Sequence, residues 1–250
     1  MTDHVTVSDD GPVRFVRMNR PDKKNALTHA MYERLTDALT TANTNDAIRA
    51  IVIAGVPGAF TAGNDLQDFL KIATATDGLA RPVRDFLPAL VNCRKPLVAA
   101  VAGVAVGIGT TMLFHCDYVV ASTDARFVTP FTSLGLVPEA ASSLIAPRMM
   151  GHARAFSLLV MGRPIDSAQA KEAGLVNTVV AADQVEAEAL AAAKHIAALP
   201  PGAVAISRAL LKGKPEERLA RIDEETELFK TRLKSPEAIA AFQAFLSKSK

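Results

Sequence analysis

The feature that most limits the fold of this chain is its longest uncharged stretch, the 19 residues Pro96–Phe114. This length approaches that of a membrane-spanning helix. However, the stretch contains three glycines and two threonines, and the charged residues Lys95 and Asp117 flank it closely. We therefore expect a buried strand, a glycine turn and the start of a helix here.

Similar apolar runs recur along the chain and alternate with helical patterns. Short β-rich runs predict strands at 13–18, 50–54, 97–101, 118–121 and 125–128. Apolar spacing of three and four residues predicts helices at 25–41, within 69–91, and at 182–199, 203–212, 215–233 and 236–247. Such alternation indicates an α/β layer architecture. We expect an α/β core over residues 1–195 and a helical C-terminal portion over residues 196–250.

Charge and composition exclude several classes of protein. The 28 Lys and Arg residues balance 26 Asp and Glu residues, and the chain has no Trp and two Tyr. This is too little positive charge and too few stacking side chains for a nucleic-acid-binding protein. Cys93 and Cys116 have neither disulfide nor zinc spacing, so we expect reduced thiols and no metal. The first residues lack a signal peptide's apolar segment and the last three are not Ser-Lys-Leu, so we expect a cytoplasmic protein with no membrane partner.

Three glycine-bearing stretches, 60–66, 103–109 and 129–139, are candidates for chemistry. Glycine between a strand and a helix lets the backbone approach a ligand, and the first N–H groups of a helix are free. The stretch 103–109 does not complete the dinucleotide motif G-x-G-x-x-G, and the chain contains neither a P-loop nor a G-x-S-x-G elbow. Taken alone, the glycines of 103–109 are more often explained by simple close packing of a helix on a strand.

Glu139 differs from the other acidic residues of the chain. It follows Pro138 in an apolar segment, with no Lys or Arg nearby in sequence before Arg148. Desolvation would raise the pKa of such a carboxyl group, which suits a general base. The sequence equally allows Glu139 to cap a helix that begins there.

Several motifs together resemble those of the crotonase (enoyl-CoA hydratase/isomerase) superfamily. They are Asn19–Leu27 (NRPDKKNAL), Ala62–Leu66 (AGNDL), Lys95-Pro96 leading into Ala102–Gly109, Cys116-Asp117, Thr129–Pro138, Gly162–Ala170 and Ala173–Val176. Each motif is weak, but they occur in order over nearly the whole chain. The resemblance implies a spiral of ββα units, a helical C-terminal trimerisation portion, and a homotrimer or dimer of trimers that acts on acyl-CoA thioesters.

The resemblance also implies roles for individual residues. The backbone N–H groups of Asn64 and Ile108 would form an oxyanion hole for a thioester enolate. Relatives that hydrate enoyl-CoA carry two glutamates at positions that hold Thr111 and Phe131 here, so we expect no hydratase activity. The Val137-Pro138-Glu139 segment is closest to the Δ3,Δ2-enoyl-CoA isomerases of the peroxisomal type, in which one base suffices.

Further residues are implied in binding of the substrate. Coenzyme A would be bound around Arg20, Lys23, Lys24 and the backbone of Ala26, with Phe245 and Lys248 contributing from the C-terminus. The loops that hold the thioester would contribute Ala62, Gly63, Asp65, Leu66, Gly107 and Phe131. Asp65 would anchor its loop. No cofactor is expected, because coenzyme A belongs to the substrate.

Three hypotheses remain open from the sequence. The favoured one is a 3-enoyl-CoA to 2-enoyl-CoA isomerase with Glu139 as base. The second is another enolate chemistry on the same scaffold, such as thioester hydrolysis or decarboxylation. The third is an acyl-CoA-binding trimer without catalytic activity. Glu139 discriminates between them, because a non-catalytic binder has no need of a lone carboxylate in an apolar turn.

Overall fold

The computed structural model describes residues 4–65 and 80–248, with side chains as far as residue 244. Its larger sheet has six strands in the order β1-β2-β3-β5-β7-β10. Strand β1 runs antiparallel to β2, and the other pairings are parallel. The strands are β1 (Val5–Asp10), β2 (Val13–Met18), β3 (Ala50–Ala54), β5 (Leu97–Val101), β7 (Tyr118–Ser122) and β10 (Thr178–Val180).

A second, four-stranded sheet has the order β4-β6-β8-β9. Its strands are β4 (Ala59–Thr61), β6 (Val104–Val106), β8 (Arg126–Val128) and β9 (Ile165–Asp166). The chain places β3 in the first sheet and β4 in the second, and it repeats this step with β5 and β6 and with β7 and β8. Helices α3 (Arg81–Val91), α4 (Ile108–Thr111) and α5 (Ser142–Met150) follow these pairs. The predicted spiral of ββα units is therefore confirmed.

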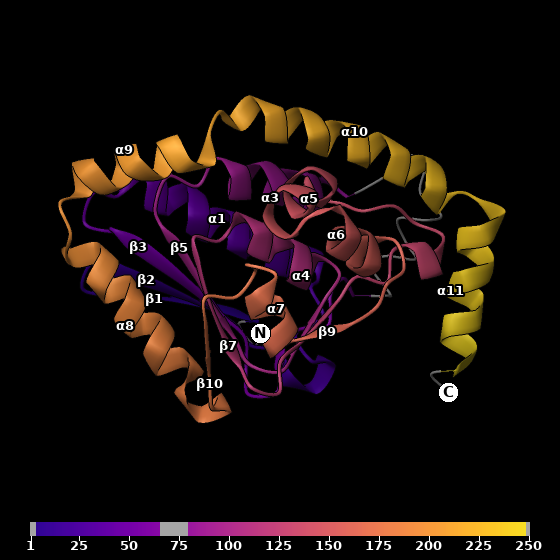
Figure 1. The fold of residues 1–250 in the computed structure, drawn as a ribbon, viewed down its shortest axis with the longest axis horizontal. Helices are drawn as coiled ribbons and strands as arrows, with labels where there is room; N and C mark the ends of the chain where they lie inside the picture. Colours follow the sequence, from indigo (N-terminus) through magenta and orange to yellow (C-terminus); the bar gives the residue numbers. More distant parts are fainter. Residues whose placement is uncertain (1–3, 66–79, 249–250) are drawn as a thin grey trace.

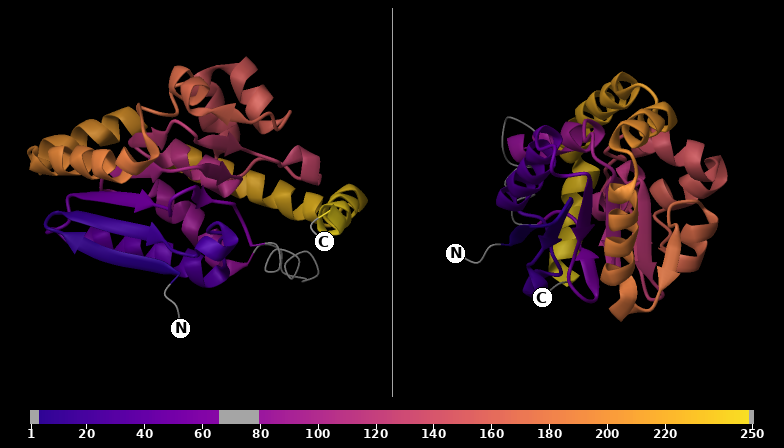
Figure 2. Two further views of the ribbon diagram at one scale, coloured as in Figure 1. Left: turned by 90° about the horizontal axis from the view of Figure 1, so that it is seen from below. Right: turned by 90° about the vertical axis from the view of Figure 1, so that its left-hand side faces the viewer.

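The remaining helices surround the sheets (Figure 1). Those of the C-terminal part run along the rim of the molecule, and α11 lies at the end opposite α8 (Figure 2). The helices are α1 (His29–Thr44), α6 (His152–Leu159), α7 (Ser167–Glu172), α8 (Val185–Ala198), α9 (Pro201–Lys212), α10 (Pro215–Leu233) and α11 (Pro236–Lys248), with 3-10 turns η1 (Pro21–Lys23), η2 (Met112–His115), η3 (Thr132–Leu134) and η4 (Ala182–Gln184). The four predicted C-terminal helices are confirmed within a few residues at their ends.

No single helix in the described part of the chain has the length and hydropathy of a membrane span. The stretches Ala182–Ala198 and Pro201–Lys212 meet both conditions only when taken together, and a bend of 111° separates them.

Strands β3 and β5 are buried on both faces, as their uninterrupted apolar sequences predict. Val52 and Val98 pack on one face with α8, through Val185 and the alanines of that helix. Residues of the opposite face join a larger core that includes α1 and α3. The uncharged stretch Pro96–Phe114 forms β5, β6, α4 and most of η2, so its lack of charge reflects burial inside the spiral.

The first helix begins later than the sequence predicts. Instead of starting at Asn25, α1 starts at His29, because the hydroxyl of Thr28 caps it by accepting a hydrogen bond from the Met31 N–H. Asn25 adopts a left-handed conformation with φ of 56°. Of the predicted helical region 69–91, the described part forms α3 from Arg81, and residues 69–79 lie outside the described residues.

Candidate active site

In the loop that follows β4, the N–H of Asn64 points away from Leu27, the residue to which the loop is hydrogen-bonded. Leu27 donates its N–H to the Gly63 carbonyl at 2.8 Å, and its own carbonyl accepts the Asp65 N–H at 2.9 Å. Leu27 and Asn64 form an isolated parallel bridge, in which the hydrogen bonds of the loop are made by the groups of Gly63 and Asp65 on either side of Asn64. The Asn64 N–H therefore points away from Leu27, and among the described residues it meets no acceptor.

The second candidate donor, the N–H of Ile108, lies at the start of α4. Gly107 precedes this helix with φ of 56°, and its carbonyl accepts the N–H groups of Thr110 and Thr111. The N–H at the first position of a helix has no carbonyl partner within the helix. Within the described part of the chain the Ile108 N–H also meets no other acceptor.

Two glycines allow these segments to touch. A Cβ atom on Gly63 would lie 2.9 Å from the Val106 carbonyl oxygen, and one on Gly109 would lie 2.5 Å from Cγ2 of Thr61. Both distances are too short for a side chain. The loop after β4 is thus packed directly against the turn before α4, which places Asn64, next to Gly63, beside Ile108, next to Gly109.

The Asn64 loop is also anchored to the segment between β2 and α1. Asn25 is fully buried, and its amide nitrogen donates to the carbonyl oxygens of Ala59 and Phe60 at 3.0 and 3.1 Å. Arg20 donates through one guanidinium nitrogen to Asp65 Oδ2 at 2.6 Å and to the Ala26 carbonyl at 2.9 Å. These contacts give Asp65 the anchoring position that the sequence suggested.

Tyr32 links this loop to Glu139. Its hydroxyl, on α1, donates to the side-chain oxygen of Asn64 at 2.5 Å. The pKa of the buried Tyr32 is raised well above its usual value, chiefly by burial and further by the charge of Glu139. Tyr32 thus contacts Asn64 directly, and the charge of Glu139 acts on its hydroxyl.

Glu139 itself is a buried carboxyl group, with 5% of its surface exposed. Burial raises its pKa to about 8, and the nearby charge of Glu225 adds to the effect. Glu139 does not cap α5, because the N-cap of this helix is Ala141. This arrangement favours the general-base interpretation over the capping one.

Glu225 is a second buried carboxylate that sequence reasoning missed. It projects from α10 and accepts hydrogen bonds from the N–H of Ala141 at 2.6 Å and from the N–H and hydroxyl of Ser143 at 3.0 and 2.5 Å. Both of its oxygens are thus occupied at the start of α5. A signal for it exists in the sequence, because Glu225 falls within the apolar stripe Ile222, Phe229 and Leu233 of α10.

The two positions that carry glutamates in hydratases are buried here without an acid. Thr111 is fully buried at the end of α4, and its hydroxyl has no hydrogen-bond partner among the described residues. Phe131 is 5% exposed and packs in the core with Leu134, Leu136 and Val137. Neither side chain can donate or remove a proton as a carboxyl group does.

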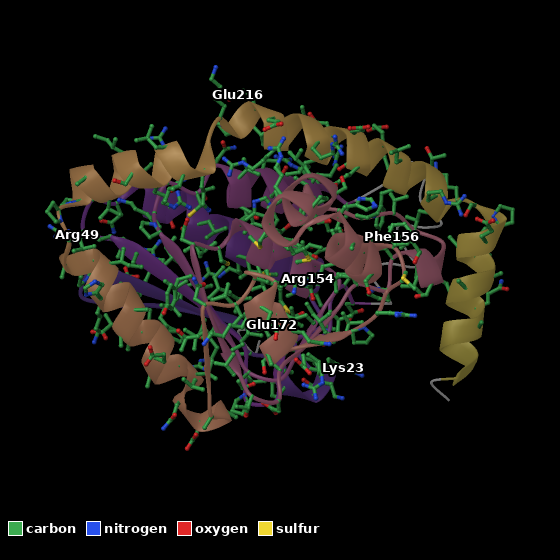
Figure 3. The ribbon with its side chains drawn as sticks, viewed as in Figure 1. Lys23, Arg49, Arg154, Phe156, Glu172 and Glu216 are labelled. Atoms are coloured by element: carbon green, nitrogen blue, oxygen red, sulfur yellow. The ribbon has the colours of Figure 1, made fainter. Side chains whose placement is uncertain are left out.

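The candidate coenzyme A residues are partly described. Lys23 and Lys24 are exposed on and beside η1, where Lys23 lies at the surface (Figure 3). The backbone carbonyl of Lys24 accepts the N–H of Ala62 at 2.8 Å, which joins this surface to the Asn64 loop. Leu66 lies outside the described residues, and so do the side chains of Phe245 and Lys248.

No group of three or more His, Cys, Asp or Glu side chains in the described ranges is arranged to hold a metal ion. The candidate site comprises the buried carboxyl group of Glu139, the Tyr32 hydroxyl on which its charge acts, and the N–H groups of Asn64 and Ile108, which have no backbone acceptor among the described residues. A buried carboxyl group can transfer a proton, and free backbone N–H groups can bind an oxygen that becomes negatively charged.

Comparisons with known proteins agree with this description. The sequence profile of the enoyl-CoA hydratase/isomerase family matches residues 9–250. The chain is 36% identical to Enoyl-CoA delta isomerase 2 of Rattus norvegicus over 98% of its own length, but it spans 63% of that relative. It is 34% identical to the "Probable enoyl-CoA hydratase" of Rhizobium meliloti, covering 98% of this chain and 95% of that one.

Among solved structures, that of Pseudomonas aeruginosa OdaA superposes with a TM-score of 0.92 at 44% identity, covering 98% of this chain and 99% of that one. The chain belongs to the enoyl-CoA hydratase/isomerase family. The resemblance found in its motifs is thereby confirmed. Because relatives named as hydratases and as isomerases both match, the family alone does not distinguish the two reactions.

Proposed function

We propose that this protein is an isomerase that converts 3-enoyl-CoA into 2-enoyl-CoA. The observation that carries the proposal is that Glu139 is a buried carboxyl group with a raised pKa, while Thr111 and Phe131 occupy the two positions at which the resemblance places the hydratase glutamates. Glu225 does not supply the second acid, because backbone and hydroxyl donors occupy both of its oxygens. Addition of water needs two groups that transfer protons, whereas a double-bond shift needs one.

In this reaction, the Glu139 carboxylate removes a proton from C2 of the substrate. The electron pair moves into the thioester carbonyl, and the resulting dienolate oxygen accepts hydrogen bonds from the N–H groups of Asn64 and Ile108. The protonated Glu139 then returns the proton to C4, which leaves the double bond between C2 and C3. A raised pKa suits this role, because it makes the carboxylate a stronger base at the working pH.

The surroundings of Glu139 support an isomerase over a hydratase. Phe131 and Leu136 are each 5% exposed and belong to the same apolar core, so this side of the site is poor in groups that could position water. Exclusion of water also protects the dienolate from protonation by solvent.

The proposal extends to substrate binding and assembly. Exposed Lys23 and Lys24 suit the phosphates of coenzyme A, and Arg20 supports the same segment through Asp65.

We also propose that the protein is a homotrimer or a dimer of trimers. In support, α9 buries no residue, and its Ile206, Leu210 and Leu211 are 66%, 78% and 89% exposed.

The decisive experiment incubates the protein with 3-hexenoyl-CoA and follows the conjugated 2-enoyl thioester by absorbance. We expect conversion by the wild type and loss of nearly all turnover in Glu139→Gln, with folding and coenzyme A binding preserved. Release of free coenzyme A would instead indicate a thioester hydrolase. Binding without any reaction would indicate a non-catalytic protein, and unchanged turnover in Glu139→Gln would refute the assignment of the base.

The complementary assay uses a 2-enoyl-CoA substrate and follows loss of its conjugated absorbance as water adds. We expect no hydration, since Thr111 and Phe131 cannot act as the acid–base pair. Rapid hydration would overturn the choice of isomerase over hydratase.

A further inference from the structure

The peptide group that joins Ala140 to Ala141, directly after Glu139, is bound on both of its edges. The carbonyl of Ala140 is 2.7 Å from Nε2 of His115. Since a carbonyl oxygen can only accept, Nε2 carries the proton and donates it. The N–H of Ala141, on the other edge, donates to Glu225 Oε2 at 2.6 Å.

This doubly held peptide group lies in an unfavourable backbone conformation. Ala140 and Ala141 have φ of 61° and 54°, although neither is glycine. A left-handed residue with a Cβ atom costs roughly 1–2 kcal/mol. Such conformations persist only where the surroundings impose them, and here His115 and Glu225 do so.

Each of the two residues is itself held in place. His115 ends η2, and its backbone carbonyl accepts a hydrogen bond from the Lys212 side chain of α9. Burial lowers the pKa of His115 to about 4, so the imidazole is neutral with one N–H to donate. Glu225 is fixed by Ser143, whose hydroxyl also accepts from Arg221 at 3.2 Å.

We propose that His115 and Glu225 are positioning residues that clamp the Ala140–Ala141 peptide group and so hold the Glu139 side chain in its reactive position. The inference deepens the proposed function and rests on it, because it assigns the groups that orient the proposed base. His115 follows α4 through η2, so the clamp also ties Glu139 to the helix that carries the Ile108 N–H. Base and oxyanion donor are thereby kept in one rigid unit.

Glu225 has a second effect that the clamp alone would not produce. Its negative charge lies near Glu139 and opposes ionisation of that carboxyl group. Other titratable or charged groups around the turn include Tyr32 of α1, the neutral His115 of η2 and Arg221 of α10. The charges of Lys212 on α9 and Arg218 on α10 act on His115. Removing the charge of Glu225 should therefore lower the pH above which Glu139 is active.

The test compares paired variants with 3-hexenoyl-CoA as substrate. His115→Leu and Glu225→Ala each remove one side of the clamp, while His115→Gln keeps an N–H donor and Glu225→Gln keeps an acceptor. Glu216→Gln, an exposed position of the same helix α10, is the control and should behave like the wild type. Circular dichroism and thermal melting establish that each variant is folded.

We expect kcat to fall by about 10–100-fold in His115→Leu and Glu225→Ala with KM changed by less than about threefold, because a small misplacement of the base slows only the chemical step. His115→Gln should recover most of the loss. In Glu225→Gln, the acid limb of the kcat/KM profile should move to lower pH by roughly 0.5–1 unit.

The outcomes separate this inference from the proposed function. A wild type that does not convert 3-hexenoyl-CoA refutes the function. An active wild type whose folded His115→Leu and Glu225→Ala variants keep kcat within about twofold refutes the clamp. If those two variants do not fold, the isosteric pair decides: a folded His115→Gln variant that loses kcat by about 10-fold or more, or an unchanged pH profile in Glu225→Gln, would overturn the clamp.

Discussion

At the scale of single residues, Glu139 shows how a fold can maintain a group that destabilises it. The carboxyl group is buried among apolar side chains next to a second carboxylate, and both surroundings oppose its ionisation. Perturbed titration of this kind is concentrated at functional sites. The two residues that we propose to hold Glu139 in place, His115 and Glu225, come from η2 and α10.

The raised pKa of Glu139 makes a prediction about stability against pH. Its folded-state pKa of about 8 lies above the ordinary value of 4.5, so the stability it contributes is present below pH 4.5 and is lost progressively up to pH 8. Glu139→Gln removes this titration. We expect the variant to be close to the wild type at pH 4.5 and more stable by roughly 3–5 kcal/mol at pH 8.5.

Urea unfolding of both proteins at several pH values measures this difference directly. The comparison between variant and wild type cancels the titration of other groups to a first approximation. An equal difference in the free energy of unfolding at pH 4.5 and pH 8.5 would contradict the raised pKa.

At the scale of elements, the site depends on two turns that touch through glycine. In the proposed reaction, Asn64 and Ile108 act through their backbone N–H groups, so their side chains matter less than the approach of the loop after β4 to the turn before α4. That approach is set by Gly63 against Val106 and by Gly109 against Thr61.

Substitution of Gly63 by alanine tests this dependence. Its φ is 87°, and the new Cβ would lie 2.9 Å from the Val106 carbonyl oxygen, so the loop must shift and carry the Asn64 N–H with it. We expect kcat for 3-hexenoyl-CoA to fall by about 10²–10³-fold, the effect of losing one oxyanion-hole donor.

Gly11→Ala is the matched control for this substitution. Gly11 lies in the turn between β1 and β2 and also has a positive φ, 57°, but a Cβ atom there would meet no described atom within 4 Å. The substitution should cost about 1 kcal/mol of stability with no change in kcat. Equal activity of both variants would show that the close approach at Gly63 does not position the donor.

At the scale of the whole molecule, the C-terminal helices bear on both the site and the surface. Glu225 of helix α10 accepts the N–H of Ala141 in the turn after Glu139, and Lys212 of α9 donates to the carbonyl of His115. Yet α9 also leaves much of its apolar surface exposed, next to a groove of about 490 Å³ lined in part by Leu199, Val204 and Leu211. Contiguous apolar surface of this kind is typical of sites of protein association.

The proposed trimer predicts that a charge on this surface weakens assembly. Leu211 is 89% exposed, so Leu211→Lys should not disturb the fold of one subunit. We expect light scattering to give about three or six times the 26.5 kDa chain for the wild type and a smaller mass for the variant. Thr40→Lys, at an exposed position of α1, is the control and should assemble normally.

A wild type that is monomeric at micromolar concentration would contradict the trimer. An unchanged mass in Leu211→Lys would show that subunits associate through another surface.

Much of the fold was predictable because it depends on local patterns. Strands β3 and β5 have the ends that their apolar runs predict, since a strand buried on both faces must be apolar throughout. The three-residue strands β4 and β6 were missed, because segments this short form strands only by pairing with each other. The start of α1 was placed too early, because the tertiary contacts of Asn25 override its helical surroundings.

The sequence by itself determined the resemblance to the family and the candidacy of Glu139, Asn64 and Ile108, because motifs are properties of neighbouring residues. Only the tertiary structure decided how these groups are held. Tyr32 reaches Asn64 across 32 residues, His115 reaches Ala140 across 25, and Glu225 reaches Ala141 across 84. Hydrogen bonds between such distant residues form only after the elements have packed, so no local pattern reveals them.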